Sequence, residues 1–192
     1  MERLCSLVKE KHLDLGFAFD GDADRCIAVD ENGNIVDGDA IMYILGKRLK
    51  SKGMLNDNTV VATVMSNSGL FKSLEEAGMN CVQTTVGDRF VYECMQENDY
   101  CLGGEQSGHI ILKKYATTGD GQLSAIRLLS VLKSTGKSLK ELADEITDFP
   151  QVLVNVRVSN FGKAQFPKDT EVQNAIKQAE KELGNNGRIL VR

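Results

Sequence analysis

The sequence lacks tryptophan, has only two prolines and contains no apolar run near the roughly 20 residues of a membrane-spanning helix. These absences exclude a Pro-rich linker and a transmembrane segment, and the N-terminus has no apolar stretch typical of a signal peptide. The net charge of −4 gives no indication of the basic surface that nucleic-acid binding requires. We therefore expect a cytoplasmic protein with no membrane partner and no nucleic-acid partner.

Cysteine is present but not in a pattern that forms cross-links or binds zinc. The five cysteines are odd in number, and no two are spaced as Cys-x-x-Cys. This pattern indicates free thiols in a reducing compartment. The length of 192 residues allows one large domain or two smaller ones, with a sizeable buried core.

Strand and helix patterns alternate along most of the chain. Asn32-Gly33 predicts a hairpin turn, and Asp39 predicts the N-cap of a helix running to about residue 52. Ser138 and Glu141 form the pattern of a capping box. The other expected strands are 16–19, 26–30, 59–65, 80–86, 100–104 and 109–112, and the other helices are 4–8, 70–77, 87–98 and 121–134. This order predicts an α/β fold, a layered mixed β-sheet with flanking helices.

The pattern changes at Pro150. Residues 151–158 alternate apolar and polar, which predicts a half-buried strand of an antiparallel sheet. A helix capped by Thr170 and Gln173 should follow, end at Gly184 and lead to a strand at 188–192. We expect three parts: 1–36, the end of a truncated α/β domain; 37–150, a complete domain; and 151–192, the start of a truncated α+β domain.

The most informative stretch is Asp20-Gly21-Asp22-Ala23-Asp24-Arg25. It puts three carboxylates at alternate positions of a turn between two buried strands. Carboxylates this close repel one another unless a cation lies among them, and a hard divalent ion with oxygen ligands fits this need. The alternative is an Asp-rich turn whose side chains bind their own backbone amides.

A second polar loop is Gly103-Gly104-Glu105-Gln106-Ser107-Gly108-His109. Its glycines allow sharp turns and close approach to a ligand. In an extended loop Glu105 and Ser107 point the same way, so they could bind the hydroxyls of a sugar. The alternative is a glycine-rich hairpin with solvent-facing polar groups and a packed His109.

Together, Asp20–Arg25 and Gly104–His109 resemble the metal loop and the sugar loop of the α-D-phosphohexomutase family. Three further stretches fit the same family: Thr63–Asn67, Val86–Arg89 and Thr117–Gly121. Gln106 resembles the amino-sugar branch, since phosphomannomutase/phosphoglucomutase members tend to carry Met at that place. A phosphomannomutase/phosphoglucomutase therefore stays the alternative within the family.

The resemblance implies an isomerase that interconverts glucosamine 6-phosphate and glucosamine 1-phosphate through a phosphoserine and a bisphosphate intermediate. It implies Mg²⁺ held by Asp20, Asp22 and Asp24. It also implies catalytic roles for Arg25, on the transferring phosphate, and for His109, as a proton shuttle. Glu105 and Ser107 would bind the sugar hydroxyls, and Arg89 would assist with phosphate.

Two motifs of the family are missing from this chain. It has no Ser-His-Asn-Pro loop, which would carry the nucleophilic serine, and no Arg-x-Ser-Gly-Thr loop for the second phosphate. We therefore expect a fragment covering the end of domain two, domain three and the start of domain four, inactive alone. Exposed strand edges of such a fragment would allow two copies to pair as a homodimer.

Two other classes of protein compete for the acidic loop. In a calcium-binding EF-hand, the three aspartates would stand at positions 1, 3 and 5, but Arg25 occupies the position that needs glycine, and the flanks predict strands. A nucleotide-sugar transferase would explain the Asp-x-Asp pattern, yet it leaves residues 103–109 without a role.

Overall fold

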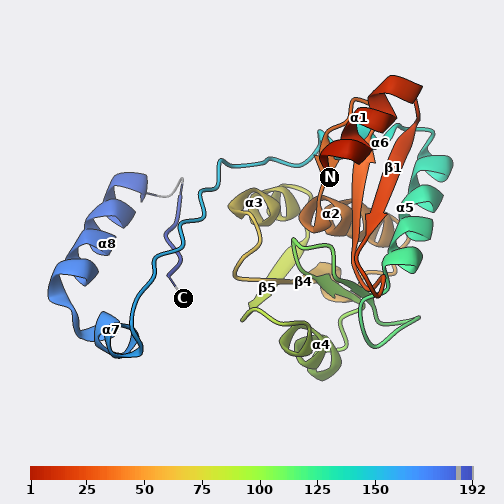
Figure 1. Cartoon of the computed structure of the whole chain (residues 1–192). Helices are drawn as coiled ribbons and strands as arrows, with labels where there is room; N and C mark the ends of the chain where they lie inside the picture. The colour runs from red at the N-terminus through yellow and green to blue at the C-terminus, as the bar shows by residue number, and fades with distance from the viewer. Residues whose placement is uncertain (185–186, 192) are drawn as a thin grey trace. The chain divides into compact units, whose positions relative to one another are not determined.

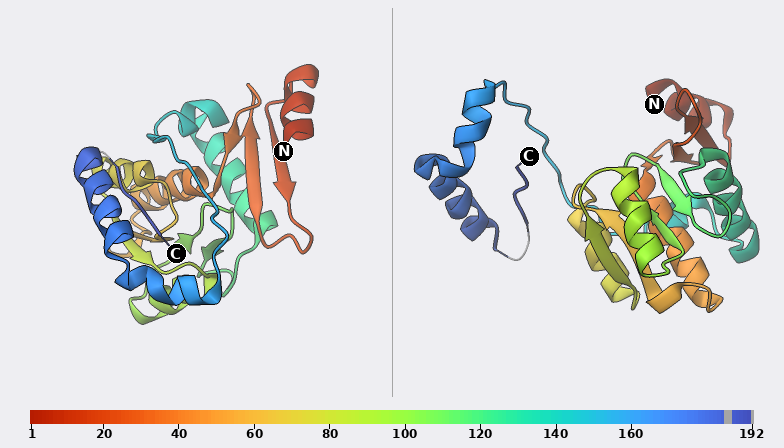
Figure 2. Two further views of the ribbon diagram at one scale, coloured as in Figure 1. Left: turned by 60° about the vertical axis from the view of Figure 1, so that its left-hand side comes forward. Right: turned by 90° about the horizontal axis from the view of Figure 1, so that it is seen from below.

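The computed structural model describes residues 1–184 and 187–191. The chain divides into two compact units, Met1–Phe149 and Pro150–Arg192, and each is described by itself (Figures 1 and 2). Among the described residues no helix is both long and apolar enough to cross a membrane. All five cysteines are free thiols, as the sequence predicts.

The first unit begins with a helix and a three-stranded antiparallel sheet. These elements are α1 (Glu2–Lys11), β1 (Leu15–Phe19), β2 (Cys26–Asp30) and β3 (Ile35–Val36), in the sheet order β1-β2-β3. The pairing of β1 with β2 ends where Phe19 lies opposite Cys26, so residues 20–25 form the connection at that end of the sheet. At the other end Gly33 adopts a φ of 75°, which confirms the predicted Asn32-Gly33 hairpin.

The rest of the first unit is a mixed four-stranded sheet with helices. Its elements are α2 (Gly38–Ser51), the 3-10 turn η1 (Asn56–Asn58), β4 (Thr59–Thr63), α3 (Ser68–Glu76), β5 (Asn80–Thr84), α4 (Asp88–Glu97), β6 (Leu102–Gly104), β7 (Ile110–Leu112), α5 (Gly121–Thr135) and α6 (Leu139–Ala143). The sheet order is β5-β4-β6-β7; β4 runs parallel to β5 and β6, and β7 runs antiparallel to β6. The predicted α/β fold with a mixed sheet is confirmed.

Different helices cover the two faces of this sheet (Figure 1). Val60 and Ala62 of β4 belong to the large core that includes α2 and α3, whereas Val61 packs with Val91 and Met95 of α4. Neighbouring residues of a strand point to opposite faces, so a strand covered on both sides needs apolar residues throughout. The same large core includes Ala28 of β2, so it extends to the first sheet.

Helix α2 of the first unit begins at a different cap residue from the one that the sequence predicts. The N-cap of α2 is Asp37, whose carboxylate accepts a hydrogen bond from the N–H of Ala40, and not Asp39. Asp39 lies in the first helical turn, is buried, and accepts a 2.7 Å hydrogen bond from the backbone N–H of Asn67. Two aspartates two residues apart can both fit the capping pattern; the tertiary contact decides between them.

The second unit contains α7 (Asn160–Gln165), the 3-10 turn η2 (Phe166–Lys168) and α8 (Thr170–Leu183). The prediction of a half-buried strand at 151–158 is wrong: this segment forms no strand, and Val152 is 85% exposed. A strand needs a neighbour for its N–H and C=O groups, and the described chain provides none there. No strand forms at 188–191 either, and Arg192 lies outside the described residues.

Helix α8 also corrects a predicted cap. Its N-cap is Asp169, which accepts from the N–H groups of Glu171 and Val172, so the predicted pair of Thr170 and Gln173 is not the cap. Gly184 ends the helix, as predicted.

Candidate functional site

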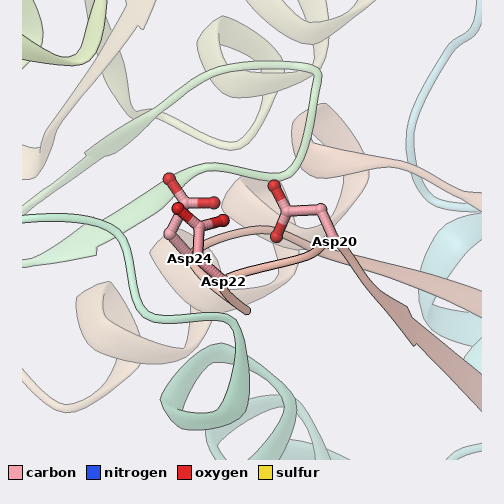
Figure 3. Close-up of side chains that lie close together, drawn as sticks. All are labelled: Asp20, Asp22 and Asp24. Atoms are coloured by element: carbon pink, nitrogen blue, oxygen red, sulfur yellow. The ribbon is translucent and has the colours of Figure 1, made fainter.

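The connection between β1 and β2 gathers three carboxylates. One oxygen each from Asp20, Asp22 and Asp24 lies within 4.8 Å of the others, and Figure 3 shows the three side chains around one space. Ala23 adopts a φ of 59°, a left-handed conformation that reverses the chain between Asp22 and Asp24. The alternate spacing and this tight turn together bring the three side chains to one place.

Neighbouring backbone fixes the shape of this acidic loop. Asp20 Oδ1 accepts a 3.2 Å hydrogen bond from the N–H of Arg25, and the carbonyl of Ala23 accepts a 2.9 Å bond from the N–H of Gly121, the first residue of α5. A Cβ on Gly121 would lie 2.5 Å from the Arg25 carbonyl oxygen. Only glycine permits this approach, so the start of α5 serves as a support for the loop.

The charges in the acidic loop influence one another. Desolvation and the neighbouring Asp20 carboxyl raise the pKa of Asp24, against an opposing influence of His109. For Asp20 desolvation is the largest influence and raises the pKa, but hydrogen bonds from the Arg25 N–H and the Asp24 carboxyl together lower it. The opposite shifts reflect the closeness of the two carboxyls, which repel each other when both are charged. A divalent cation among them would relieve this repulsion.

The Arg25 side chain lies next to Asp20 at the acidic loop. Its Nε lies 3.6 Å from Asp20 Oδ2, and the side chain is half exposed. A guanidinium that keeps most of its donors free can still bind an anion that approaches the carboxylates.

His109 lies beneath the acidic loop and is buried. Its Nδ1 lies 2.9 Å from Asp24 Oδ2, and its Nε2 accepts a 2.9 Å hydrogen bond from the backbone N–H of Gly119. Both ring nitrogens are therefore occupied within the protein. The role of proton shuttle needs a nitrogen that reaches the substrate and stays a prediction; in this structure the ring contacts Asp24 and Gly119.

The glycine-rich loop joins the acidic loop through its backbone. Arg25 and His109 form an isolated antiparallel bridge, and the N–H of Cys26 donates to the carbonyl of Gly108 at 3.1 Å. A Cβ on Gly108, whose φ is 92°, would lie 2.4 Å from the Cys26 carbonyl oxygen. The two motifs are far apart in the sequence, with 85 positions between Asp24 and His109, but they are neighbours in the fold.

Glu105 and Ser107 lie together at the surface of the glycine-rich loop. The Ser107 hydroxyl donates to Glu105 Oε2 at 3.4 Å, and Glu105 Oε1 accepts a 3.0 Å bond from the N–H of Gly87. Ser107 is exposed and Glu105 is partly exposed. A carboxylate and a hydroxyl side by side, both open to solvent, can bind adjacent hydroxyl groups.

Arg89 lies in the first turn of α4, close in sequence to Gly87. Its side chain is 79% exposed, and its Nε donates to Glu93 Oε1 at 2.7 Å. The pKa of Arg89 is raised by this hydrogen bond and by the charge of Glu93. Its role in phosphate binding stays a prediction, since it now forms a surface ion pair.

Three backbone donors of the site, Gly87, Gly119 and Gly121, lie in stretches that fit the family, but the sequence alone assigns them no contact in the site. Gly119 and Gly121 flank Asp120, the N-cap of α5, where the sequence predicts only the start of a helix. A glycine on each side of a capping residue was the signal of close backbone approach that could have identified them.

Comparison with known proteins shows the family to which this chain belongs. The family described as phosphoglucomutase/phosphomannomutase matches this chain in two places, alpha/beta/alpha domain II at residues 1–33 and alpha/beta/alpha domain III at residues 37–149. The chain belongs to this family, the α-D-phosphohexomutases. The flanking strands and this membership rule out the EF-hand alternative.

Several individual proteins of known sequence or structure are similar to this chain. The chain is 59% identical over 191 residues to the phosphoglucosamine mutase of Bacillus subtilis, covering 100% of this chain and 42% of that protein. Among solved structures, Aspergillus fumigatus N-acetylphosphoglucosamine mutase shares the fold, with a TM-score of 0.73 at 22% identity over 92% of this chain and 42% of that one. A structure of that enzyme with GlcNAc-6P and magnesium gives a TM-score of 0.62 at 23% identity, covering 77% and 35%. The chain thus spans less than half of its curated relative.

Proposed function

We propose that this chain carries the metal-binding and sugar-binding loops of a phosphoglucosamine mutase, which interconverts glucosamine 6-phosphate and glucosamine 1-phosphate. One observation carries the proposal: the Arg25–His109 bridge sets the three carboxylates of the acidic loop beside Glu105 and Ser107. A phosphoryl transfer between two positions of a sugar needs both a charge-neutralising site and a hydroxyl-binding site next to it. The 59% identity to a phosphoglucosamine mutase supports the choice of sugar.

The metal in this proposal is Mg²⁺, held by Asp20, Asp22 and Asp24. The donor set fits, because Mg²⁺ prefers oxygen ligands. One atom supports it directly: Asp24 Oδ1 is buried and has no hydrogen-bond donor within the described part of the chain. When bound, the ion supplies positive charge that stabilises the transferring phosphoryl group.

The other residues act on the substrate. Arg25 contacts the phosphate that approaches the acidic loop, since its guanidinium suits phosphate oxygens. Glu105 and Ser107 bind sugar hydroxyls. The N–H of Gly87 donates a hydrogen bond that positions the Glu105 carboxylate for this contact. Arg89 helps to bind phosphate once its ion pair with Glu93 is broken. The boundaries 1–36, 37–150 and 151–192, a cytoplasmic location and a homodimer are further parts of this proposal.

A chimera tests the function. The 191 aligned residues of the Bacillus subtilis enzyme are replaced by this chain, and turnover of glucosamine 6-phosphate is measured. We expect an active chimera. Glu105→Gln should raise KM more than it lowers kcat, because a charge-assisted hydrogen bond of about 1.5–3 kcal/mol to the sugar is weakened.

The matched control is Glu10→Gln, on an exposed position of α1, which should leave both constants unchanged. An inactive chimera that is folded contradicts the proposed function. Preference for mannose 6-phosphate or glucose 6-phosphate over the amino sugar would support the alternative branch of the family. An unchanged KM in Glu105→Gln would remove the sugar-binding role.

A further inference from the structure

His109 holds a single carboxylate of the acidic loop through a fixed arrangement of hydrogen bonds. Its Nε2 accepts from the N–H of Gly119, which is a backbone donor that cannot become an acceptor. Nε2 therefore carries no proton. In the neutral imidazole the proton is then on Nδ1, which donates to Asp24 Oδ2 at 2.9 Å. The backbone of Gly119 sets the tautomer, and the tautomer sets the direction of the bond to Asp24.

The position of this imidazole is rigid. The His109 side chain is 4% exposed, and a Cβ on Gly119 would lie 2.7 Å from three of its ring atoms. On the other side, the His109 carbonyl accepts from the N–H of Glu105 at 3.0 Å, and its backbone bridges to Arg25. Another acidic group, Asp88, has a carboxylate oxygen 3.9 Å from Nε2. Burial and the hydrogen bonds at both ring nitrogens restrain the ring against turning away from Asp24.

The two carboxylate oxygens of Asp24 therefore have different hydrogen-bond partners. Oδ2 receives the proton of Nδ1, whereas Oδ1 is buried without a donor in the described residues. Without an anchor, repulsion from the neighbouring carboxylates would favour a rotation of Asp24 out of the cluster. A hydrogen bond to one oxygen restrains that rotation and leaves the other oxygen without a protein donor among the described residues.

We propose that His109 is a positioning residue, which fixes Asp24 with Oδ1 directed toward the divalent cation, and that it does not transfer protons to the substrate. This rests on the proposed metal function of the acidic loop. Since the backbone of His109 also binds Glu105 and Arg25, the same residue sets the acidic loop at a constant place relative to the sugar-binding loop. It therefore aligns the two halves of the site before any ligand binds.

Metal binding by the whole chain tests the proposal without any enzyme assay. Mn²⁺, as a probe for Mg²⁺, is titrated by electron paramagnetic resonance against wild type, His109→Ala and His109→Asn. The Asn side chain keeps an N–H near the place of Nδ1 but cannot transfer protons near neutral pH. We expect His109→Ala to weaken Mn²⁺ binding roughly 10–100-fold, the usual effect of losing a partner of a metal ligand, and His109→Asn to recover most of it.

Two controls accompany the titration. His12→Asn makes the same substitution at the other histidine, which is exposed and adopts a left-handed conformation that Asn accepts, so it should not alter binding. Circular dichroism shows which variants fold. Long-range ¹H–¹⁵N NMR of wild type reports the tautomer, which should have the proton on Nδ1.

The outcomes separate this proposal from the proposed function. If wild type binds Mn²⁺ and a folded His109→Ala binds it equally well, the positioning role is wrong while the metal site stands. If wild type binds no Mn²⁺, both fall. If His109→Ala does not fold, His109→Asn and the NMR decide: a folded His109→Asn that binds as weakly as Asp24→Asn, or a proton on Nε2 in wild type, overturns the positioning role.

Discussion

The carboxylate of Glu105 accepts a hydrogen bond from the backbone N–H of Gly87 at 3.0 Å. Gly87 is the N-cap residue of α4 and has a φ of 129°, a conformation that side-chain-bearing residues rarely adopt. The N-terminus of a helix stabilises a nearby anion through its free N–H groups. The predicted sugar-binding carboxylate is thus held by a helix that the sequence analysis connected only with phosphate.

This contact predicts the effect of Gly87→Ala. The substitution forces a strained backbone, at about 1–3 kcal/mol, and moves the N–H that holds Glu105. We expect weaker binding of glucosamine 6-phosphate to the chain, measured by NMR titration. Gly53→Ala is the matched control, since Gly53 also has a positive φ, of 65°, with nothing near its Cβ position. Equal affinity in both variants would show that Gly87 does not position Glu105.

A second prediction concerns metal and stability. If the three carboxylates hold Mg²⁺, the ion should raise the midpoint of thermal unfolding, and a chelator should reverse the rise. At a free concentration 100 times Kd, the gain is about 2.7 kcal/mol. Asp22→Asn should remove the rise, and without metal it should be no less stable than wild type because one repulsive charge is gone. A rise of the same size in Asp22→Asn would place the ion elsewhere.

The sequence predicts the parts of the site that depend on local order. Alternate aspartates between two apolar runs predict a turn with converging carboxylates, and β1 and β2 do flank that turn. Three glycines around Glu105 predict a loop that approaches other backbone closely, and Gly108 does so at Cys26. These features need only spacing and the steric properties of glycine.

Other features of the fold and of the site depend on contacts between residues that are distant in the sequence. Nothing near His109 indicates that Asp24, 85 positions away, will bind its ring. The Val-rich segment 151–158 has a clear strand pattern, yet a strand forms only where another strand accepts its hydrogen bonds. The choice between Asp37 and Asp39 as the cap of α2 depends on the distant N–H of Asn67.

That choice leads to a third prediction. Asp37→Ala removes an N-cap bond and should cost about 1 kcal/mol of unfolding free energy. Asp39→Ala should cost more, roughly 1–3 kcal/mol, because it leaves the buried N–H of Asn67 without its acceptor. Urea unfolding of both variants measures the difference. The reverse order would indicate that Asp39 is the true cap.

The cysteines provide a fourth prediction. Burial raises the pKa of Cys26 to about 11, and burial together with the charge of Asp39 raises that of Cys81 to about 12. At pH 8 only about one Cys26 in a thousand is a thiolate, the form that reacts. Iodoacetamide labelling followed by mass spectrometry should therefore modify these two last among the five. Early labelling of Cys26 in the folded protein would contradict its burial.

The last prediction concerns pH and the ion pairs of Glu145. Desolvation is the largest influence on this carboxyl and raises its pKa, but hydrogen bonds and charge from Lys137 and Lys47 lower it below the ordinary 4.5. The Lys137 Nζ lies 2.7 Å from Oε1, and Lys47 binds Oε2. A folded-state pKa below the unfolded one stabilises the fold above the unfolded pKa, and this stabilisation is lost as the pH falls through the folded pKa.

Glu145→Gln should therefore be less stable than wild type at pH 7 by about 1 kcal/mol, since the pair is near the surface. The difference should shrink below pH 4.5 and disappear once wild-type Glu145 is protonated. Urea unfolding at several pH values measures it. Glu76→Gln, whose carboxylate is 63% exposed and lies 3.9 Å from Lys72, is the control and should show a smaller difference. A deficit in Glu145→Gln that stays constant down to the most acidic pH would mean that packing, and not charge, is what Glu145 contributes.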